Sequence, residues 1–367
     1  MGASSYYVQL DGVRILFDCG ICSMPGKPQL PDFEYLEVGQ LSSYSDLDAV
    51  VLSHAHLDHI GALPYLYQKT GNIPYFATEA TKRLSYLQLV KFGKDRAFLN
   101  PSLRMLSQEA INNISECSLL TRYYINKGRE NEAYIEFYPA GHCPGAVITK
   151  LVTKSHTLCY TGDFNPDSKE QINEFRTDDL KSDILIMNAT KGYSKKKYND
   201  YDDLISQIEK SFYTYGQTAI YANNIAKYLD MFCKINSGET SLKFVVEHDL
   251  KSMVEAFEKM GYPIYSPKIR EQRRYEKNPE VVITSRPDRY ENAGLINTSN
   301  YSLHPDIDEL TEFTRKVSPK EIYIVHTNAK RKGSDNIISR LAGDVCISSK
   351  IFQCENVKEY EIGVMPN

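Results

Sequence analysis

A short segment near residue 55 concentrates side chains that bind metal ions. Residues 53–59, with the sequence SHAHLDH, directly follow an apolar stretch typical of a buried strand. Burying so many polar groups without partners is expensive, and imidazole and carboxylate are ligands that zinc prefers. His54 and His56 alternate, so both can reach one side of an extended loop, while Asp58 and His59 can serve a second ion. We therefore expect a metal centre here rather than a histidine-rich surface turn.

Two later motifs place the same ligand types at the ends of predicted strands. His142 lies in GHCPG after the predicted strand 134–139, and Asp163 lies in YTGDF after the predicted strand 157–161. A lone histidine after a strand is more often structural, but each of these residues lies beside glycine, in the order expected for a binuclear site. His142 would add a third neutral ligand and Asp163 a bridging carboxylate. Asp18 is a candidate for the carboxylate that fixes a ligand histidine.

The elements that would position these residues form an α/β pattern. Residues 6–17 predict a hairpin with a tight Asp-Gly turn. Further strands are expected at 47–52, 73–77, 134–139, 146–153, 157–161 and 183–188, with helices at 62–69 and 79–92, and residues 94–130 are expected to be helical. This order favours an α/β sandwich over a strict βαβ repeat. After residue 191 a clearer β/α alternation predicts a small parallel-sheet domain.

Composition sets broader limits on the function. The 367 residues are 42% hydrophobic and 25% charged, as in ordinary globular proteins. No apolar run approaches the roughly 20 residues of a membrane span, and the N-terminus does not resemble a secretory signal. The eight scattered cysteines favour a reducing compartment, so an intracellular protein is expected, cytoplasmic or nuclear. The formal net charge of −4 argues against a surface that coats nucleic acid everywhere, but not against a local basic groove.

Taken together, these motifs resemble the signature of the metallo-β-lactamase superfamily. The resemblance rests on the HAHLDH segment, His142 and Asp163, and it implies an αββα sandwich with zinc at one edge. It also implies that His54, His56 and His142 hold one zinc ion, that Asp58 and His59 help to hold a second, and that Asp163 bridges the two.

The later part of the chain is similar to the β-CASP nucleases of this superfamily. These nucleases insert a small α/β domain after the strand that follows the bridging aspartate, which implies domains at 1–191, 192–290 (the insert) and 291–367. His304, before a predicted helix, and His326, after a predicted strand, match two further family motifs. His326 would complete the second zinc site, and a histidine there resembles the RNA-acting branch rather than the DNA-acting one.

The resemblance implies hydrolysis of phosphodiester bonds in RNA. A water activated between the two cations would attack phosphorus in line, Asp58 would orient it, and His304 would protonate the leaving oxygen or bind the phosphate. A DNA nuclease, a small-molecule zinc hydrolase and a low-activity member that needs protein partners are the alternatives. The small-molecule enzymes need neither an inserted domain nor late histidines.

One departure from the family pattern qualifies this expectation. Asn188 stands where the family usually has an acidic residue, and asparagine cannot be anionic. If the acid normally orients the histidine that matches His304, that partner is weakened here. Basic side chains shortly after His326 are candidates for contacts with RNA phosphates; they are Lys330, Arg331 and Lys332.

Overall fold

The computed structural model divides the chain into two compact units. The first comprises residues 1–168, 173–195 and 304–367, and the second comprises 169–172 and 196–303. The structure describes residues 3–22, 29–39, 41–91, 101–166, 178–192, 203–222, 225–273, 276, 279–298, 301, 304–327, 336–355 and 358–362. Each unit is described by itself below.

The first sheet of unit 1 begins with the expected hairpin. Asp11 and Gly12 connect its two strands with φ angles of 47° and 77°, the left-handed turn geometry that Asp-Gly favours. The remaining strands add in parallel, in the order β1-β2-β3-β4-β5. Their bounds are β1 (Tyr6–Leu10), β2 (Val13–Phe17), β3 (Ala49–Val51), β4 (Tyr75–Ala77) and β5 (Ile114–Glu116).

The second sheet of unit 1 has seven strands in the order β17-β16-β10-β9-β8-β7-β6. Strands β6 to β9 pair antiparallel, whereas β9, β10, β16 and β17 pair in parallel. The bounds are β6 (Arg122–Ile125), β7 (Ala133–Pro139), β8 (Val147–Val152), β9 (Thr157–Tyr160), β10 (Ile184–Asn188), β16 (Glu321–Val325) and β17 (Lys350–Gln353). Because β10 and β16 are parallel neighbours, the residues that follow them come to the same edge of the sheet.

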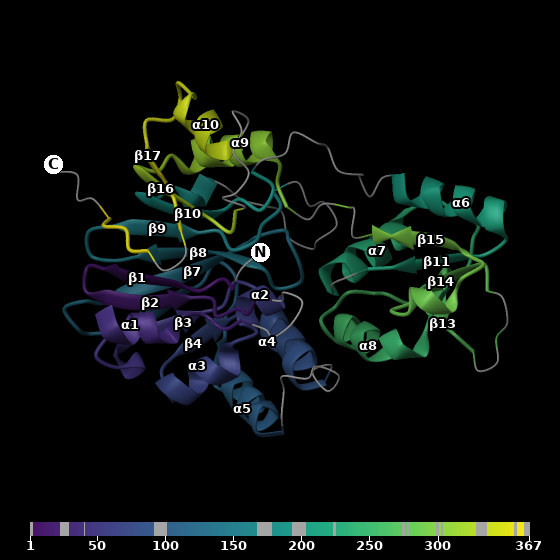
Figure 1. Ribbon diagram of the computed structural model, residues 1–367, viewed down its shortest axis with the longest axis horizontal. Coiled ribbons are helices and arrows are strands. Elements are labelled where there is room, and N and C mark those ends of the chain that lie inside the picture. The colour runs from purple at the N-terminus through teal and green to yellow at the C-terminus, as the bar shows by residue number, and fades with distance from the viewer. Residues whose placement is uncertain are drawn as a thin grey trace. The chain divides into compact units, whose positions relative to one another are not determined.

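The two sheets pack face to face between two layers of helices (Figure 1). One hydrophobic cluster, which includes Phe17, Phe137 and Tyr160, fills the space between the sheets, and a second joins the first sheet to its helices. The helices of unit 1 are α1 (Phe33–Gly39), α2 (Leu57–Ile60), α3 (Leu63–Thr70), α4 (Glu79–Tyr86), a π-helical turn (Leu87–Lys91), α5 (Pro101–Asn112), α9 (Ile307–Val317), α10 (Ile337–Ala342) and 3-10 turns at Tyr44–Asp46 and Asp178–Leu180. This αββα sandwich confirms the predicted fold class.

The helical expectation for residues 94–130 was wrong in its second half. Helix α5 ends at Asn112, and strands β5 and β6 follow it. Ile114–Glu116 joins the edge of the first sheet, and Arg122–Ile125 pairs antiparallel with β7. The sequence RYYI of β6 suits a pleated surface, and its partner β7 is the next strand along the chain, so the two form an antiparallel hairpin across residues 126–132.

The second unit contains a parallel sheet of five strands in the order β13-β12-β14-β11-β15. Its bounds are β11 (Thr218–Tyr221), β12 (Phe244–Val246), β13 (Ile269–Glu271), β14 (Val281–Ile283), β15 (Gly294–Asn297), α6 (Leu204–Tyr215), α7 (Ile225–Ser237), α8 (Lys251–Lys259) and 3-10 turns at His248–Leu250 and Pro287–Arg289. The sequence places the end of the insert at residue 290. In the structure β15 pairs with β11, so the contacts of this unit extend to Leu303.

Candidate metal centre

The histidine-rich segment follows the carboxyl end of β3, the buried central strand of the first sheet. His54 and His59 are fully buried, and helix α2 starts within the segment at Leu57. Backbone hydrogen bonds attach the segment to the end of the hairpin. Cys19 N–H donates to the carbonyl oxygen of His59 at 2.7 Å, and Ile21 N–H donates to that of Leu57 at 2.9 Å. These hydrogen bonds fix the segment against the end of the hairpin.

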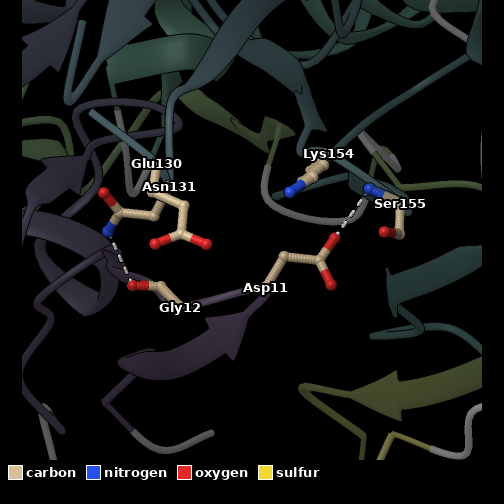
Figure 2. A pocket seen from close by; sticks show the side chains of 6 residues that line it. All are labelled: Asp11, Gly12, Glu130, Asn131, Lys154 and Ser155. Carbon is tan, nitrogen blue, oxygen red and sulfur yellow. Dashed lines mark hydrogen bonds between the residues drawn. The ribbon is translucent and has the colours of Figure 1, made fainter. Parts of the chain in front are cut away.

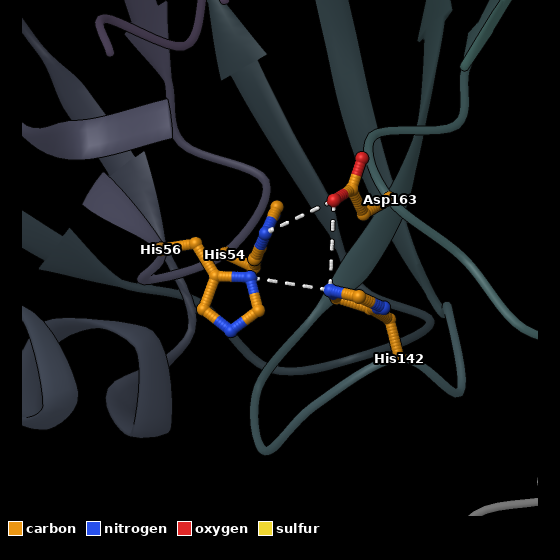
Figure 3. Close-up of side chains that lie close together, drawn as sticks. All are labelled: His54, His56, His142 and Asp163. Atoms are coloured by element: carbon orange, nitrogen blue, oxygen red, sulfur yellow. Dashed lines mark hydrogen bonds and ion pairs between the residues drawn. The ribbon is translucent and has the colours of Figure 1, made fainter. Parts of the chain in front are cut away.

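Four of the expected ligands form one group. His54, His56, His142 and Asp163 each offer a donor atom, and these atoms lie within 4.8 Å of one another. Figure 3 shows the three rings and the carboxylate converging on one point. Oδ2 of Asp163 lies 3.8 Å from Nε2 of His54 and 3.6 Å from Nε2 of His142. Three imidazoles and one carboxylate are a suitable donor set for zinc.

Asp58, His59 and His326 form a second group, of three residues, whose donor atoms also lie within 4.8 Å of one another. Nε2 of His59 lies 3.5 Å from Oδ1 of Asp163, and Nε2 of His326 lies 3.5 Å from Oδ2 of Asp58. The two oxygens of Asp163 thus face different groups, Oδ2 the first and Oδ1 the second. This is the arrangement of a carboxylate placed to be shared by two ions.

Buried ring nitrogens support the metal interpretation independently of the motifs. Among the described residues, Nε2 of His54 and Nε2 of His326 are buried, face the carboxylates of the ligand groups and have no hydrogen-bond partner. A buried polar atom without a partner costs free energy, and a group of such atoms in one place requires an explanation. Ions coordinated by these nitrogens would remove the cost, so the residues present fit a metal centre.

Asp18 supports the second group from behind. Its Oδ2 accepts a hydrogen bond from Nδ1 of His59 at 2.7 Å, which leaves Nε2 of that ring turned to the ligand group. Ser53 donates to Asp18 through both its backbone N–H and its hydroxyl, each at 2.7 Å, and Tyr160 donates its hydroxyl at 2.5 Å. The sequence did not assign Ser53 or Tyr160 a role, although both lie within the motifs quoted for the ligands.

The late residues come to the same place. Asn188 ends β10, and His326 directly follows β16, its parallel neighbour. His304 precedes α9, with Nδ1 3.9 Å from Oδ2 of Asp163 and its ring centroid 4.8 Å from that of His142. The structure therefore brings His304 and His326 to the ligand groups, across more than 130 residues from Asp163.

Burial and charge act differently on these histidines. Burial lowers the pKa of His56 to about 4 and that of His304 to about 3, so both rings are neutral near pH 7. Burial also opposes the charged form of His326, but the nearby carboxylates of Asp163 and Asp58 raise its pKa to about 8. Neutral imidazoles are suited to metal coordination, and the proton on His326 is held more tightly than those on His56 and His304.

The residues predicted to contact RNA phosphates, Lys330, Arg331 and Lys332, are outside the described residues. A surface pocket of about 490 Å³ is lined by Asp11, Gly12, Glu130, Asn131, Lys154 and Ser155 (Figure 2). It contains none of the candidate ligands, and Asp11 serves there to bind the backbone N–H of Ser155 at 2.9 Å. Among the described residues, no helix has the length and apolar character that a bilayer crossing requires.

Comparisons with known proteins agree with the motifs. A family model described as a metallo-beta-lactamase superfamily domain matches residues 7–189. Integrator complex subunit 11 of Danio rerio is 30% identical over 193 residues, which are 52% of this chain and 32% of that protein. Cleavage and polyadenylation specificity factor subunit 3 of Dictyostelium discoideum is 28% identical over 196 residues (52% and 24%). The probable RNase MJ4 of Methanocaldococcus jannaschii is 31% identical over 199 residues (53% and 44%).

The curated relatives are thus matched over less than half of their own length. A crystal structure of a protein of unknown function from Enterococcus faecalis V583 covers 97% of this chain and 95% of its own, with a TM-score of 0.64 and 14% identity, and so shares the fold. The motifs, the sandwich and the family model agree: the chain belongs to the metallo-β-lactamase superfamily and resembles its β-CASP nucleases.

Proposed function

We propose that this protein is a phosphodiesterase that uses two zinc ions to cleave RNA inside the cell. The observation that carries the proposal is the pair of ligand groups that share Asp163, with His304 beside them. A site for one structural ion would not need seven candidate ligands around a common carboxylate. When bound, a pair of ions lowers the pKa of water and offsets negative charge on a phosphate group.

The surrounding side chains can position a phosphodiester. Asp58 is half-buried, and one of its oxygens faces His326. Its carboxylate can therefore accept a hydrogen bond from a water molecule and so hold that water's lone pair toward phosphorus. His304 has a depressed pKa, so a neutral ring that donates N–H to a phosphate oxygen fits better than a stored acid. We therefore assign Asp58 to orientation of the nucleophile and His304 to contact with the phosphate.

The names of the similar proteins favour RNA as the substrate. These names include a probable RNase and a cleavage and polyadenylation specificity factor subunit. His326 matches the later of the two further family motifs, and a histidine there supports the RNA-acting branch over a DNA nuclease. Integrator complex subunit 11 is by name part of an assembly, which makes protein partners part of the proposal.

Cleavage of end-labelled, single-stranded RNA tests the function directly, with DNA of the same sequence alongside. Metal-loaded wild-type protein should cut the RNA, and Asp58→Ala should reduce cutting at least a hundredfold because the nucleophile loses its orienting carboxylate. Asp288→Ala is the matched control, since Asp288 is an exposed aspartate in the second unit. Product lengths distinguish internal from terminal cleavage.

The other outcomes point to the alternatives. Cutting of DNA but not RNA would support a DNA nuclease on the same scaffold. Two bound zinc ions with both nucleic acids left intact would overturn the proposal for the isolated chain, and would direct attention to small phosphodiesters, to thioester or lactone substrates, or to activity that requires a partner.

A further inference from the structure

The side chain of Asn188 is held in one orientation by groups whose roles are not in doubt. The backbone N–H of Thr190 donates to Oδ1 of Asn188 at 3.2 Å, and the hydroxyl of Thr190 donates to the same oxygen at 2.8 Å. Nδ2 donates to Oδ1 of Asp163, which can only accept when ionised. A flipped amide would lose the backbone donor and face the carboxylate with an oxygen. The amide nitrogen is therefore assigned by its partners.

That nitrogen also lies 2.7 Å from Nδ1 of His326. An amide nitrogen has no lone pair to offer, so this contact is favourable only when Nδ1 accepts. Two acceptors that could serve a proton on Nδ1 are farther away, Oδ1 of Asp163 and Oγ1 of Thr190, both at 3.3 Å. A neutral His326 whose Nδ1 accepts carries its proton on Nε2, the nitrogen that faces Asp58 at 3.5 Å.

The two ligand groups therefore differ in whether their histidine nitrogens are free of a proton and can bind a metal ion. In the second group, Nδ1 of His59 bonds to Asp18, so its Nε2 is available. Nε2 of His326 is not available in the same way. A metal ion can bind this atom only after its proton has left, and the neutral ring must then carry a proton on Nδ1, which would face the amide nitrogen of Asn188. A fully protonated ring carries the same proton on Nε2. In the first group, Nε2 of His54 has no hydrogen-bond partner and Nδ1 of His56 faces Nε2 of His142 at 3.3 Å. Among the described residues, the amide nitrogen of Asn188 contacts neither His54 nor His56.

We infer that Asn188 is a positioning residue that weakens the second metal site by holding His326 in the tautomer with its proton on Nε2. The chain then fills the group of His54, His56, His142 and Asp163 first, and the group of Asp58, His59 and His326 only at higher metal concentration. An acid at position 188 would accept a proton from Nδ1 of His326 and would free Nε2. The inference concerns metal occupancy and rests on the proposed function only through the proposed pair of ions.

Histidine tautomers can be read in the wild-type protein without any substitution at position 188. Nitrogen-15 spectra of the metal-free protein at about pH 9, where a ring with a pKa of about 8 is mostly neutral, should show a protonated Nε2 and an unprotonated Nδ1 for His326. The His326 signals are identified by their loss in His326→Gln. A His326 signal with the proton on Nδ1 alone would overturn the inference at once.

Metal titration tests the consequence. Calorimetry with zinc should give one tight site and a second that is at least tenfold weaker, and Asn188→Asp should tighten the second at least tenfold while changing the first much less. Asn131→Asp is the matched control, because Asn131 is half-buried at the pocket of Figure 2, outside the ligand groups, and donates to the carbonyl of Gly12. Two equally tight sites in the wild type would contradict the inference.

A charge effect and a tautomer effect can be separated. A new carboxylate beside Asp163 that acted only by its charge would strengthen both sites alike, and that result would count against the inference. Asn188→Ala removes the amide donor without adding charge and should also tighten the second site relative to the first. These measurements do not depend on RNA. Metal affinities that agree with the inference therefore support it even if the protein cuts no nucleic acid. Metal affinities that disagree with the inference count against it even if the protein cuts RNA.

Discussion

At the scale of single residues, the site depends on carboxylates that are saturated with hydrogen bonds. Asp18 shows this most clearly, since it accepts from Ser53 twice, from His59 and from Tyr160. Four donors directed at two oxygens leave no place for an amide NH2 group. Asp18 is thus matched to an ionised carboxylate, and its charge is used to orient a ligand rather than to contact a substrate.

Asp18→Asn should therefore weaken metal binding by about 10- to 100-fold, because the amide nitrogen must face one of these donors and His59 loses its fixed tautomer. Competition with a zinc chelator measures the affinity. Asp11→Asn is the matched control, since Asp11 binds Thr153 and Ser155 in a turn outside the ligand groups. Equal zinc affinities in Asp18→Asn and wild type would show that His59 does not need this carboxylate.

At the scale of elements, the ligand loop is shaped by a close approach of two backbones. A Cβ atom on Gly20 would lie 1.7 Å from the carbonyl oxygen of Asp58 and 2.7 Å from the backbone nitrogen of His59. Because both neighbours are backbone atoms, no rotation of a side chain can relieve the overlap. Glycine is thus required where the end of the hairpin crosses the ligand segment.

Gly20→Ala should displace Asp58 and His59, lower the free energy of unfolding by about 1–3 kcal/mol or more, and reduce zinc binding at the second group. Thermal unfolding and zinc titration measure the two effects. Gly343→Ala is the control, since Gly343 is exposed at the end of α10 and its Cβ would come no closer than 3.3 Å to another atom. A Gly20→Ala protein with normal stability and normal zinc binding would contradict the close approach.

Helix α9 shows how an element can position a histidine that lies outside it. Asp306 is its N-cap and accepts from the backbone N–H groups of Asp308 and Glu309, while Glu309 accepts from the backbone of Asp306. Asp306→Ala should cost about 1 kcal/mol of stability. Because His304 lies two residues earlier, RNA cleavage should fall more than zinc content does, which parallel activity and metal assays would reveal. A proportional loss of zinc would instead assign the cap to the ligand groups.

Sequence patterns predicted the local parts of this site well and the distant pairings less well. The HAHLDH segment, the hairpin turn and the sandwich could be predicted because ligand types, Asp-Gly and strand patterns are local signals. Strand β5 could not, since it pairs in parallel with β4, which lies well before it in the sequence. The hydrogen bonds of Asn188 and of Tyr160 join residues 138 and 142 positions apart, and only the sheet order brings them together.

Asn188 illustrates the same limit in its chemistry. The sequence linked it to His304 through the family pattern, whereas the structure joins it by hydrogen bonds to Asp163 and His326. The parallel register Asn188↔Val325 places the residue after β16 beside it. A substitution of acid by amide therefore bears on a metal ligand as well as on the phosphate contact that the pattern suggested.

At the scale of the whole molecule, every candidate ligand belongs to the first unit, although the second unit interrupts that unit in the sequence. His54 to Asp163 come before the interruption, and His304 and His326 come after it. Binding energy that depends only on the native state of one unit stabilises that unit alone. The ions are therefore expected to stabilise the contact between the part of unit 1 that precedes the second unit in the sequence and the part that follows it.

Removal of metal should consequently loosen one unit and spare the other. A site held at 100 times its dissociation constant contributes about 2.7 kcal/mol, which a chelator would abolish. Hydrogen exchange should then speed up at the ends of β3, β10 and β16, while β11, β12 and β14 of the second unit keep their protection, since none of them supplies a ligand. Mass spectrometry of peptides from both units, with and without chelator, measures this, and zinc restored in excess should reverse it. Equal loss of protection in both units would mean that the metal centre stabilises the chain as a single cooperative body.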